Sequence, residues 1–282
     1  MIRLLLTTIM FFSLFGCQPG KIDQMIIGMF ANAQESPVAK QTILTQNATK
    51  SVSISQQNHQ GLEVPAYSDN DFILKRTAYT TSYDKVNKIP KWVAWHLISD
   101  HTNGNQKRLS NFIIDDKVPA PRAELVDYKG SGYDRGHMCP AGDNKWESEP
   151  MKESFFLTNV CPQDHHLNCG DWNELEIACR NWANKYGGIY IVAGPILYKG
   201  KHETIGPNKV TVPEGFFKVV LCMNGPPKAI GFIYKNHPCN NPQSSYVNSI
   251  DQVERITGFD FFYNLPDDIE KKVEANANLS DW

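Results

Sequence analysis

Apolar residues along this chain gather in short runs that turn-forming residues separate. The stretch 188–195 is apolar throughout and is bounded by glycine and proline, a pattern typical of a buried central strand. The stretches 215–223 and 228–234 predict two more strands, and the Asn-Gly-Pro-Pro segment 224–227 between them favours a hairpin turn. This part of the chain therefore predicts an antiparallel sheet.

Shorter apolar stretches predict the remaining strands. They are 79–83, 92–97, 111–115 and 154–159. His96 lies beside Val93 and Trp95 in one of these stretches. We therefore expect it to be a core histidine whose hydrogen bonds are satisfied.

The strongest helix prediction begins at Asp171. Asp171 is a suitable N-cap, Glu174 follows it as in a capping box, and Gly187 is a suitable C-terminal stop. An apolar stripe at helical spacing predicts the face that packs on the core. Its residues are Trp172, Leu175, Cys179, Trp182 and Tyr186.

Two shorter helices are predicted near the C-terminus. Ser249 and Gln252 form a capping-box pattern for a helix that ends at Gly258, and the charged stretch 267–275 predicts a surface helix. Strands and helices together predict an α+β fold, in which helices flank a central, mostly antiparallel sheet.

The N-terminus has the features of an export signal. A positively charged Met-Ile-Arg start precedes the apolar run 4–15, which is too short to span a bilayer. The Leu-Phe-Gly-Cys sequence ending at Cys17 resembles a lipoprotein signal. We therefore expect residues 1–17 to be a signal peptide and Cys17 to carry a lipid that anchors an exported protein in the cell envelope. Ordinary cleavage after the Ala-Asn-Ala segment 31–33, giving a periplasmic or secreted protein, is the alternative.

Composition sets the expected domain boundaries. The stretch 18–61 is rich in polar residues toward its end and predicts a flexible tether, which leaves 62–282 as the folded domain. The net charge of −2 excludes a protein that coats nucleic acid, because such proteins are strongly basic.

Six cysteines follow Cys17. They are Cys139, Cys161, Cys169, Cys179, Cys222 and Cys239. An even number of cysteines in an exported chain favours disulfides. Cys139 lies two residues after His137, so a disulfide there would stiffen the loop around that histidine.

The segment 131–138 contains an acid, a guanidinium, a glycine and an imidazole in consecutive positions, Asp134-Arg135-Gly136-His137. His137 is a candidate general base, because an imidazole titrates near pH ~6.5. Arg135 offers a planar fork that suits a phosphate, and Gly136 lets the backbone turn tightly. Asp134 is a candidate to orient a neighbouring group or a metal-bound water. Taken alone, this cluster is equally compatible with a solvated turn.

A second polar block follows at regular spacing. After Asn159 and Gln163 it continues, at steps of four residues, through Asn168, Trp172, Glu176 and Arg180. Glu176 and Arg180 lie one helical turn apart, next to the apolar stripe. Taken alone, this pair would be an ordinary surface salt bridge.

The two blocks together resemble the DNA/RNA non-specific endonuclease family, sugar-non-specific nucleases with a ββα-metal active site. The Asp-Arg-Gly-His-Met segment 134–138 matches the family signature, and Asn168 with the residues at four-residue steps after it matches the spacing of the metal-binding helix. The similarity extends from about 62 to about 265. It implies hydrolysis of DNA and RNA with little sequence preference, to products bearing a 5′-phosphate.

The resemblance also implies roles for individual residues. Asn168 would be the one direct protein ligand of Mg²⁺ or Mn²⁺, hard cations that prefer oxygen and keep several waters. Glu176 would hold those waters, and Arg180 would face the phosphate or the leaving group. The family carries a further arginine upstream, for which Arg108 is the candidate and Arg122 the alternative.

Other interpretations of these residues stay open at this point. Cys161 and Cys169 flank His165 and His166, which is compatible with a zinc site. The fold is also compatible with a phosphodiesterase acting on nucleotides or other small phosphate esters, or with a surface lipoprotein that only binds. The sequence carries no signal of oligomeric state.

Overall fold

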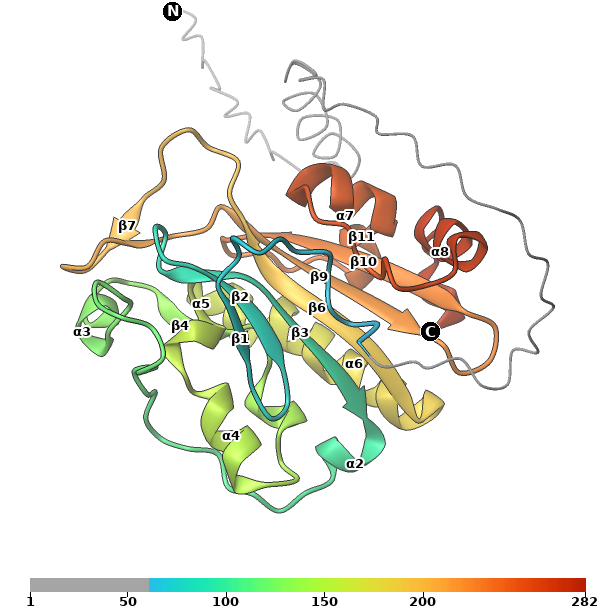
Figure 1. Cartoon of the computed structure of the whole chain (residues 1–282), viewed down its shortest axis with the longest axis horizontal. Helices are drawn as coiled ribbons and strands as arrows, with labels where there is room; N and C mark the ends of the chain where they lie inside the picture. The colour runs from blue at the N-terminus through green and yellow to red at the C-terminus, as the bar shows by residue number, and fades with distance from the viewer. Residues whose placement is uncertain (1–60) are drawn as a thin grey trace, which may run out of the picture. The chain divides into compact units, whose positions relative to one another are not determined.

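A seven-stranded sheet lies at the centre of the structure, a computed structural model that describes residues 61–282 (Figure 1). The strand order is β1-β2-β3-β6-β9-β10-β11, and every neighbouring pair runs antiparallel. The strands are β1 Ile73–Lys75, β2 Thr80–Asp84, β3 Ile89–Ile98, β6 Gly188–Ile196, β9 Gly215–Cys222, β10 Lys228–Lys235 and β11 Val247–Asn248. This arrangement confirms the predicted α+β fold with a central antiparallel sheet.

Helices and four shorter strands complete the described chain. The helices are α2 Ser99–Thr102, α3 Leu125–Tyr128, η2 Ala141–Asp143, α4 Ser148–Ser154, η3 Leu157–Asn159, α5 His165–Cys169, α6 Asp171–Tyr186, η4 Gln243–Tyr246, α7 Ile250–Thr257, α8 Asp267–Glu274 and η5 Leu279–Asp281. The shorter strands are β4 Asp134–His137, β5 Val160–Gln163, β7 Thr204–Ile205 and β8 Val210–Thr211.

The predictions made for the N-terminal sixty residues lie outside the described residues. They are the signal peptide 1–17, the lipid at Cys17, the alternative cleavage after 31–33 and all but the last residue of the tether 18–61. Within residues 61–282, none of the helices has the length and hydrophobicity that a transmembrane span requires.

Side chains on the two faces of the central sheet form two separate hydrophobic clusters. On β6, which is buried along its whole length, Ile191 belongs to one cluster and Val192 to the other. On β3, Trp95 belongs to the first cluster and Ala94 to the second. A strand covered on both faces needs apolar residues at consecutive positions, which explains the continuous apolar run in β6.

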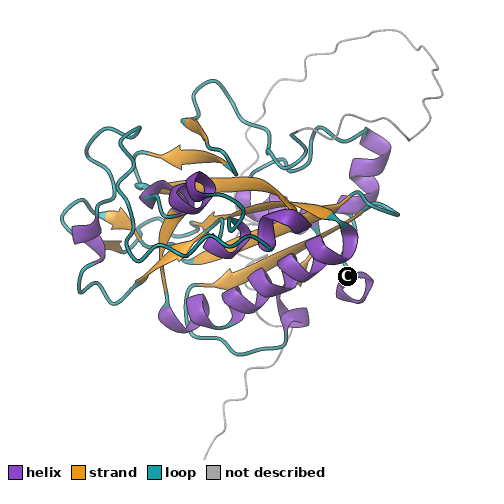
Figure 2. Ribbon diagram, turned by 90° about the horizontal axis from the view of Figure 1, so that it is seen from below, coloured by secondary structure: helices purple, strands orange, loops and turns teal. Residues whose placement is uncertain are grey.

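One long helix covers the first face, and two shorter helices cover the second. Trp172 and Leu175 of α6 belong to the first cluster, and Figure 2 shows this helix running along one side of the sheet. Val253 of α7 and Val273 of α8 belong to the second cluster, and both helices contact β10. Three residues of the second polar block, Trp172, Glu176 and Arg180, lie on α6 and therefore on the first face of the sheet.

The helix boundaries follow the predicted signals, with one correction. Ser249 and Gln252 form the capping box of α7, and Gly258 ends that helix with a positive φ. Gly187 ends α6 in the same way, but the N-cap of α6 is Gly170 rather than Asp171. Asp171 is the first helical residue, and its carboxylate accepts a hydrogen bond from the Tyr246 hydroxyl instead of capping the helix.

Two strand predictions are wrong. The stretch 111–115 makes only an isolated bridge, between Ile113 and Phe156. The stretch 154–159 contains the end of α4 and the turn η3, and the strand begins only at Val160. In both places buried apolar residues pack without a continuous ladder, so hydrophobicity alone indicated burial and not conformation.

Two further expectations are also wrong. His96 is exposed and not part of the core, and its ring stacks on that of Tyr190, with ring centroids 4.2 Å apart. The disulfides expected for the exported chain are not formed by Cys139, Cys161, Cys169, Cys179 and Cys222, which are free thiols. Cys139 is buried and accepts a hydrogen bond from Asn144 Nδ2 at 3.4 Å, so no disulfide stiffens the loop after His137.

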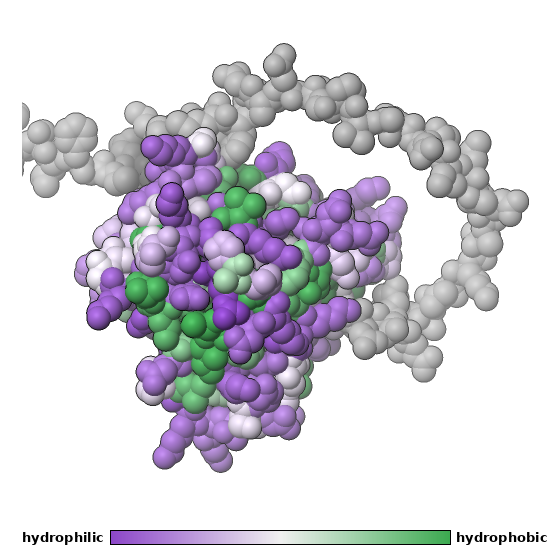
Figure 3. All heavy atoms as spheres, turned by 60° about the vertical axis from the view of Figure 1, so that its left-hand side comes forward, coloured by the Kyte–Doolittle hydropathy of each residue, from purple (hydrophilic) through white to green (hydrophobic). Residues whose placement is uncertain are grey.

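Hydrophobic residues are exposed at several places on the surface of residues 61–282. Figure 3 shows one face, on which hydrophilic side chains surround a band of hydrophobic ones. The large hydrophobic residues that are exposed are Tyr67, Val86, Leu109, Leu125, Val126, Ile177, Tyr198 and Tyr263. Exposure of this kind is normal in folded proteins and indicates no particular partner.

Candidate active site

The two sequence motifs meet in a small hairpin-like pair of strands followed by helices. β4 carries the Asp-Arg-Gly-His motif and pairs antiparallel with β5, with Asp134 opposite Gln163 and His137 opposite Val160. The chain then enters α5 and α6 directly after β5. The order strand, strand, helix is the ββα arrangement that the resemblance implied.

Gly136 is required by its neighbour across the strand pair rather than by a turn. It lies within β4, and a Cβ at this position would be 2.1 Å from Gln163 Oε1 and 2.6 Å from Gln163 Cβ. The expectation of a tight turn at Gly136 is therefore wrong. The missing side chain makes room for Gln163, which is fully buried.

His137 lies in an aromatic pocket at the end of β4. Its side chain is only 7% exposed, and its ring centroid is 4.9 Å from that of Phe112 and 5.1 Å from that of Phe155. Nε2 is buried and has no hydrogen-bond partner among the described residues. Trp172 Nε1 donates to the His137 carbonyl at 3.3 Å, which links the motif to the start of α6.

Burial, together with the smaller effect of the positive charges of Arg108 and Arg135, lowers the pKa of His137 to about 3. The imidazole is therefore neutral across the physiological pH range. A neutral imidazole can accept a proton, as a general base requires.

Arg108 and Arg135 lie over the same two rings that enclose His137. The guanidinium carbon of Arg108 is 5.3 Å from the Phe155 centroid, and that of Arg135 is 5.0 Å from the Phe112 centroid. Both arginine side chains are exposed. Phe112 and Phe155 thus hold two cations at the mouth of the histidine pocket.

Arg122, the alternative to Arg108, has a different environment. Its Nη1 donates to the carbonyl oxygens of Asp115 and Val118, at 3.2 and 2.6 Å. These bonds fix the loop that precedes α3. Of the two candidates, the structure places Arg108 beside His137.

Asp134, His165 and Asn168 form a second polar group on the other end of β4. Asp134 Oδ2 accepts from Asn168 Nδ2 at 2.8 Å and lies 2.9 Å from His165 Nδ1. Asn168 lies on α5, and Gly170 interrupts the chain before α6, so the four-residue spacing from Asn168 does not follow one continuous helix.

The donor atoms of this second group suit a hard cation. Asn168 supplies a carboxamide and Asp134 a carboxylate, both half-buried, and oxygen is the ligand that Mg²⁺ and Mn²⁺ prefer. The residues present therefore fit the metal that the family implies.

Asn159 supports the loop after His137. Its Oδ1 accepts from the Cys139 N–H at 2.9 Å, and its Nδ2 donates to the carbonyls of Cys139 and Ser154, both at 2.8 Å. The side chain is completely buried. These hydrogen bonds brace the loop after His137.

Glu176 and Arg180 on α6 do not form a simple surface pair. Arg180 Nη1 donates to Asp143 Oδ1 at 3.1 Å, and Asp143 also accepts from Trp95 Nε1 at 3.1 Å. Burial raises the pKa of Glu176 to about 7, an effect that the positive charge of Lys218 opposes.

Lys218 is a buried cation on the central strand β9. It is fully buried, and its ammonium nitrogen is 4.3 Å from the Trp172 ring centroid. Together with Arg180 it balances the negative charges of Glu176 and the buried Asp143. A row of alternating charges therefore extends from the sheet to α6.

Sequence reasoning did not assign several residues of this site. A usable signal existed for His165, which lies three residues before Asn168 and so on the same helical face, and for Lys218, the one charge in an otherwise apolar run. Phe112 and Phe155 had no such signal, because aromatic residues in apolar stretches usually belong to the core.

The zinc interpretation is not supported by the described residues. Cys161 is buried in β5, Cys169 is exposed at the end of α5, and neither joins His165 or His166 in a group with metal-ligand spacing. Between residues 61 and 282, the group of side chains with that spacing is an acidic one on α7 and α8.

Comparisons with known proteins agree with this geometry. The family model described as DNA/RNA non-specific endonuclease matches residues 58–268. A nuclease from Nostoc sp. is 31% identical over 258 residues, covering 86% of this chain and 93% of the relative. The mitochondrial nuclease EXOG of Mus musculus is 32% identical, covering 77% of this chain and 65% of its own length.

A solved structure is similar as well. The endonuclease in the crystal structure of the EndoG/EndoGI complex, which describes inhibition of EndoG, matches with a TM-score of 0.66 and 30% identity. The match covers 70% of this chain and 87% of the other. The chain spans less than two thirds of the length of the EXOG relatives from mouse, Xenopus laevis and Danio rerio, at 65%, 58% and 59%.

Proposed function

This chain belongs to the DNA/RNA non-specific endonuclease family, and on that premise we propose that it hydrolyses phosphodiester bonds of DNA and RNA with little sequence preference. The observation that carries the proposal is the placement of a neutral, enclosed His137 on the same short strand as Asp134, which contacts Asn168. One short strand thus carries a proton acceptor at one end and a carboxylate that contacts Asn168 at the other.

His137 acts as the general base in this proposal. It accepts a proton from a water molecule whose oxygen bonds to phosphorus, while the bond from phosphorus to the 3′ oxygen breaks. The products then carry a 5′-phosphate and a 3′-hydroxyl. The phosphate charge of a bound substrate favours the imidazolium that forms, because an opposite charge nearby stabilises the protonated ring.

The proposed cofactor is Mg²⁺ or Mn²⁺. Asn168 would bind the ion directly, and Asp134 and Glu176 would hold its waters, a ligand set that suits a hard cation. The bound ion supplies positive charge for the transition state and the leaving oxygen. Ionised Glu176 is required for this role, and Lys218 beside it favours the ionised form.

The two arginines at the mouth of the pocket bind phosphate in this proposal. Arg135 and Arg108 are exposed, their planar groups lie over Phe112 and Phe155, and each offers a fork of donors. Arg180 donates to Asp143 and contributes positive charge beside Glu176 from the side of α6.

Export is part of the proposal and is supported by the sequence pattern alone. A signal peptide over 1–17 and a lipid at Cys17 would place the nuclease in the cell envelope. Mass spectrometry of the mature N-terminus distinguishes lipidation at Cys17 from cleavage after residue 33.

The test of the function is cleavage of plasmid DNA and of a folded RNA, with Mg²⁺ or with chelator, by the wild type and by His137→Ala. We expect metal-dependent cleavage of both polymers and a turnover lower by roughly 10²–10⁴-fold in the variant, the usual contribution of a general base. Circular dichroism checks that the variant is folded.

Each negative result has a separate meaning. Near-normal turnover of a folded His137→Ala variant would remove His137 as the base. Cleavage of a small phosphodiester, with both polymers left intact, would favour the alternative of a phosphodiesterase acting on small esters. Activity that is unchanged in chelator would remove the metal from the proposal.

A further inference from the structure

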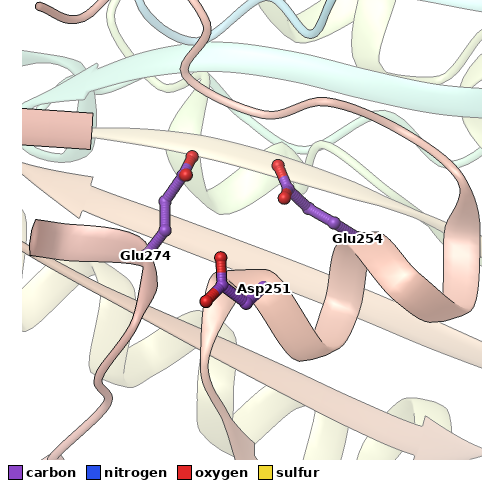
Figure 4. A group of neighbouring side chains, drawn as sticks. All are labelled: Asp251, Glu254 and Glu274. Carbon is purple, nitrogen blue, oxygen red and sulfur yellow. The ribbon is translucent and has the colours of Figure 1, made fainter. Parts of the chain in front are cut away.

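Three carboxylates converge between the two C-terminal helices, on the face of the sheet opposite to α6. Asp251 and Glu254 lie on α7, Glu274 is the last residue of α8, and Figure 4 shows their carboxylates pointing toward one another. One oxygen from each residue lies within 4.8 Å of the other two. This distance is far shorter than unscreened like charges would favour.

Glu274 is a buried acid with an unsatisfied oxygen. The residue is 7% exposed, and its Oε1 is buried without a hydrogen-bond partner among residues 61–282. A buried carboxylate oxygen without a donor is costly, and such atoms usually indicate an ion or a water. The carboxylate that carries this oxygen points toward the other two carboxylates (Figure 4).

The side chains around this cluster add negative charge, and no basic side chain of residues 61–282 forms an ion pair with it. Asp260 and Glu270 also act on Glu254 and Glu274 and raise the pKa of both, after the larger effect of burial. None of the ion pairs in the described chain includes Asp251, Glu254 or Glu274. Glu254 Oε1 accepts the Phe261 N–H at 2.8 Å, which fixes that carboxylate in place.

We propose that Asp251, Glu254 and Glu274 form a binding site for a calcium-type divalent cation that joins α7 to α8. A set made only of oxygens selects a hard cation. Ca²⁺ takes its oxygens at roughly 2.3–2.6 Å, so two ligands on opposite sides of the ion are about 5 Å apart, close to the spacing of these carboxylates. Three carboxylates and waters can complete its coordination.

The site is separate from the metal group at Asn168 and has a structural role. Residues of α7 and α8 pack on the second hydrophobic cluster, so an ion between the helices stabilises the cover of that face. Because the readouts below are binding and unfolding, they do not depend on the proposed nuclease activity.

The test uses the full chain, freed of metal by chelator and then transferred to chelator-free buffer at pH 7.5. Isothermal titration with CaCl₂ is carried out on the wild type, Asn168→Ala, Glu274→Gln and the double variant Asp251→Asn/Glu254→Gln. Asp268 is an exposed acid on α8, and Asp268→Asn is the control, because it removes one negative charge just as Glu274→Gln does. Thermal unfolding with and without Ca²⁺ is measured on the same proteins, with Mg²⁺ for comparison.

We expect one equivalent of Ca²⁺ to bind in the wild type, Asn168→Ala and Asp268→Asn with a rise in Tm, and this equivalent to be lost in Glu274→Gln and in the double variant. Loss of all Ca²⁺ binding in Asn168→Ala would overturn the proposal. So would a full Ca²⁺ response in Glu274→Gln, or the absence of any response in the wild type. If Glu274→Gln does not fold, the Ca²⁺ response of the double variant Asp251→Asn/Glu254→Gln is the test: its loss supports the proposal, and a full response overturns it.

Discussion

At the scale of single residues, the site depends on how burial changes the chemistry of ordinary side chains. His137 would titrate near pH ~6.5 in water, but enclosure by Phe112 and Phe155 together with two neighbouring arginines lowers its pKa to about 3. Desolvation disfavours the charged form of each group, which is why the same environment keeps an imidazole neutral and raises the pKa of Glu176.

Arg108 and Arg122 should respond differently to truncation. Arg108→Ala removes an exposed cation beside His137, so we expect kcat/KM on DNA to fall by roughly 10–100-fold, as for loss of a charged hydrogen bond, with Tm unchanged. Arg122→Ala removes two donations to backbone carbonyls, so we expect a lower Tm. Initial rates and thermal melts of both variants are the measurements. The reverse pattern would assign the substrate role to Arg122.

Asn168→Ala should alter the metal dependence of the reaction. The variant loses the proposed direct ligand, and we expect the Mg²⁺ concentration for half-maximal activity to rise by about tenfold or more. A Mg²⁺ titration of plasmid cleavage measures this. Asn173→Ala, on the next helix, is the matched control and should leave the titration unchanged. An unchanged midpoint in Asn168→Ala would remove Asn168 as a ligand.

At the scale of elements, the pairing of β4 with β5 brings together residues that are some thirty positions apart. Asp134 meets Asn168 and His165 because β5 returns antiparallel to β4 and leads directly into α5. Trp172 then ties α6 back to β4 through the His137 carbonyl. A misplaced strand pair would therefore move the proposed base His137 and the proposed metal-binding residues Asp134 and Asn168 together.

Gly136→Ala tests this dependence. Its Cβ would meet Gln163 Oε1 at 2.1 Å, so we expect overpacking to cost about 1–3 kcal/mol of unfolding free energy and to reduce activity as well. Thermal melts and plasmid cleavage measure both effects. Gly200→Ala is the control, because a Cβ there would have no heavy atom within 4 Å. Equal behaviour of the two variants would contradict the crowding at Gly136.

At the scale of the whole domain, the central sheet separates two regions with different charge balance. On the side of α6, the buried Lys218 and the half-buried Arg180 offset the charges of Asp143 and Glu176. On the side of α7 and α8, acids gather without a paired cation, and burial with mutual repulsion raises the pKa of Glu254 to about 7 and of Glu274 to about 8.

This acidic side predicts how metal-free stability depends on pH. The folded-state pKa of Glu274 is raised above its unfolded value. The contribution of protonated Glu274 to the free energy of unfolding is therefore fully present below about pH 4.5, and it is lost as the pH rises through about 8. Glu274→Gln cannot ionise, so in chelator its Tm should exceed that of the wild type by an amount that grows from pH 6 to pH 9. Asp268→Asn should show no such growth. A constant difference would mean that Glu274 does not titrate in this range.

The sequence by itself determined the features that depend on neighbouring residues. Caps and stops set the ends of α7 and the end of α6, and the apolar run of β6 predicted a strand covered on both faces. The motif around His137 and the spacing to Glu176 indicated the family, because the chemistry of phosphodiester hydrolysis restricts which residue types stand in these positions.

Tertiary structure alone decided what depends on contacts between distant segments. It left the His96 side chain exposed, kept Cys139 a free thiol, and made Gly136 necessary for Gln163 and not for a turn. It also placed Arg108, and not Arg122, beside the ring of Phe155, and brought Glu274 to α7. The pattern of a single stretch reports burial and local conformation, whereas the partner of a side chain is fixed only when strands and helices pack.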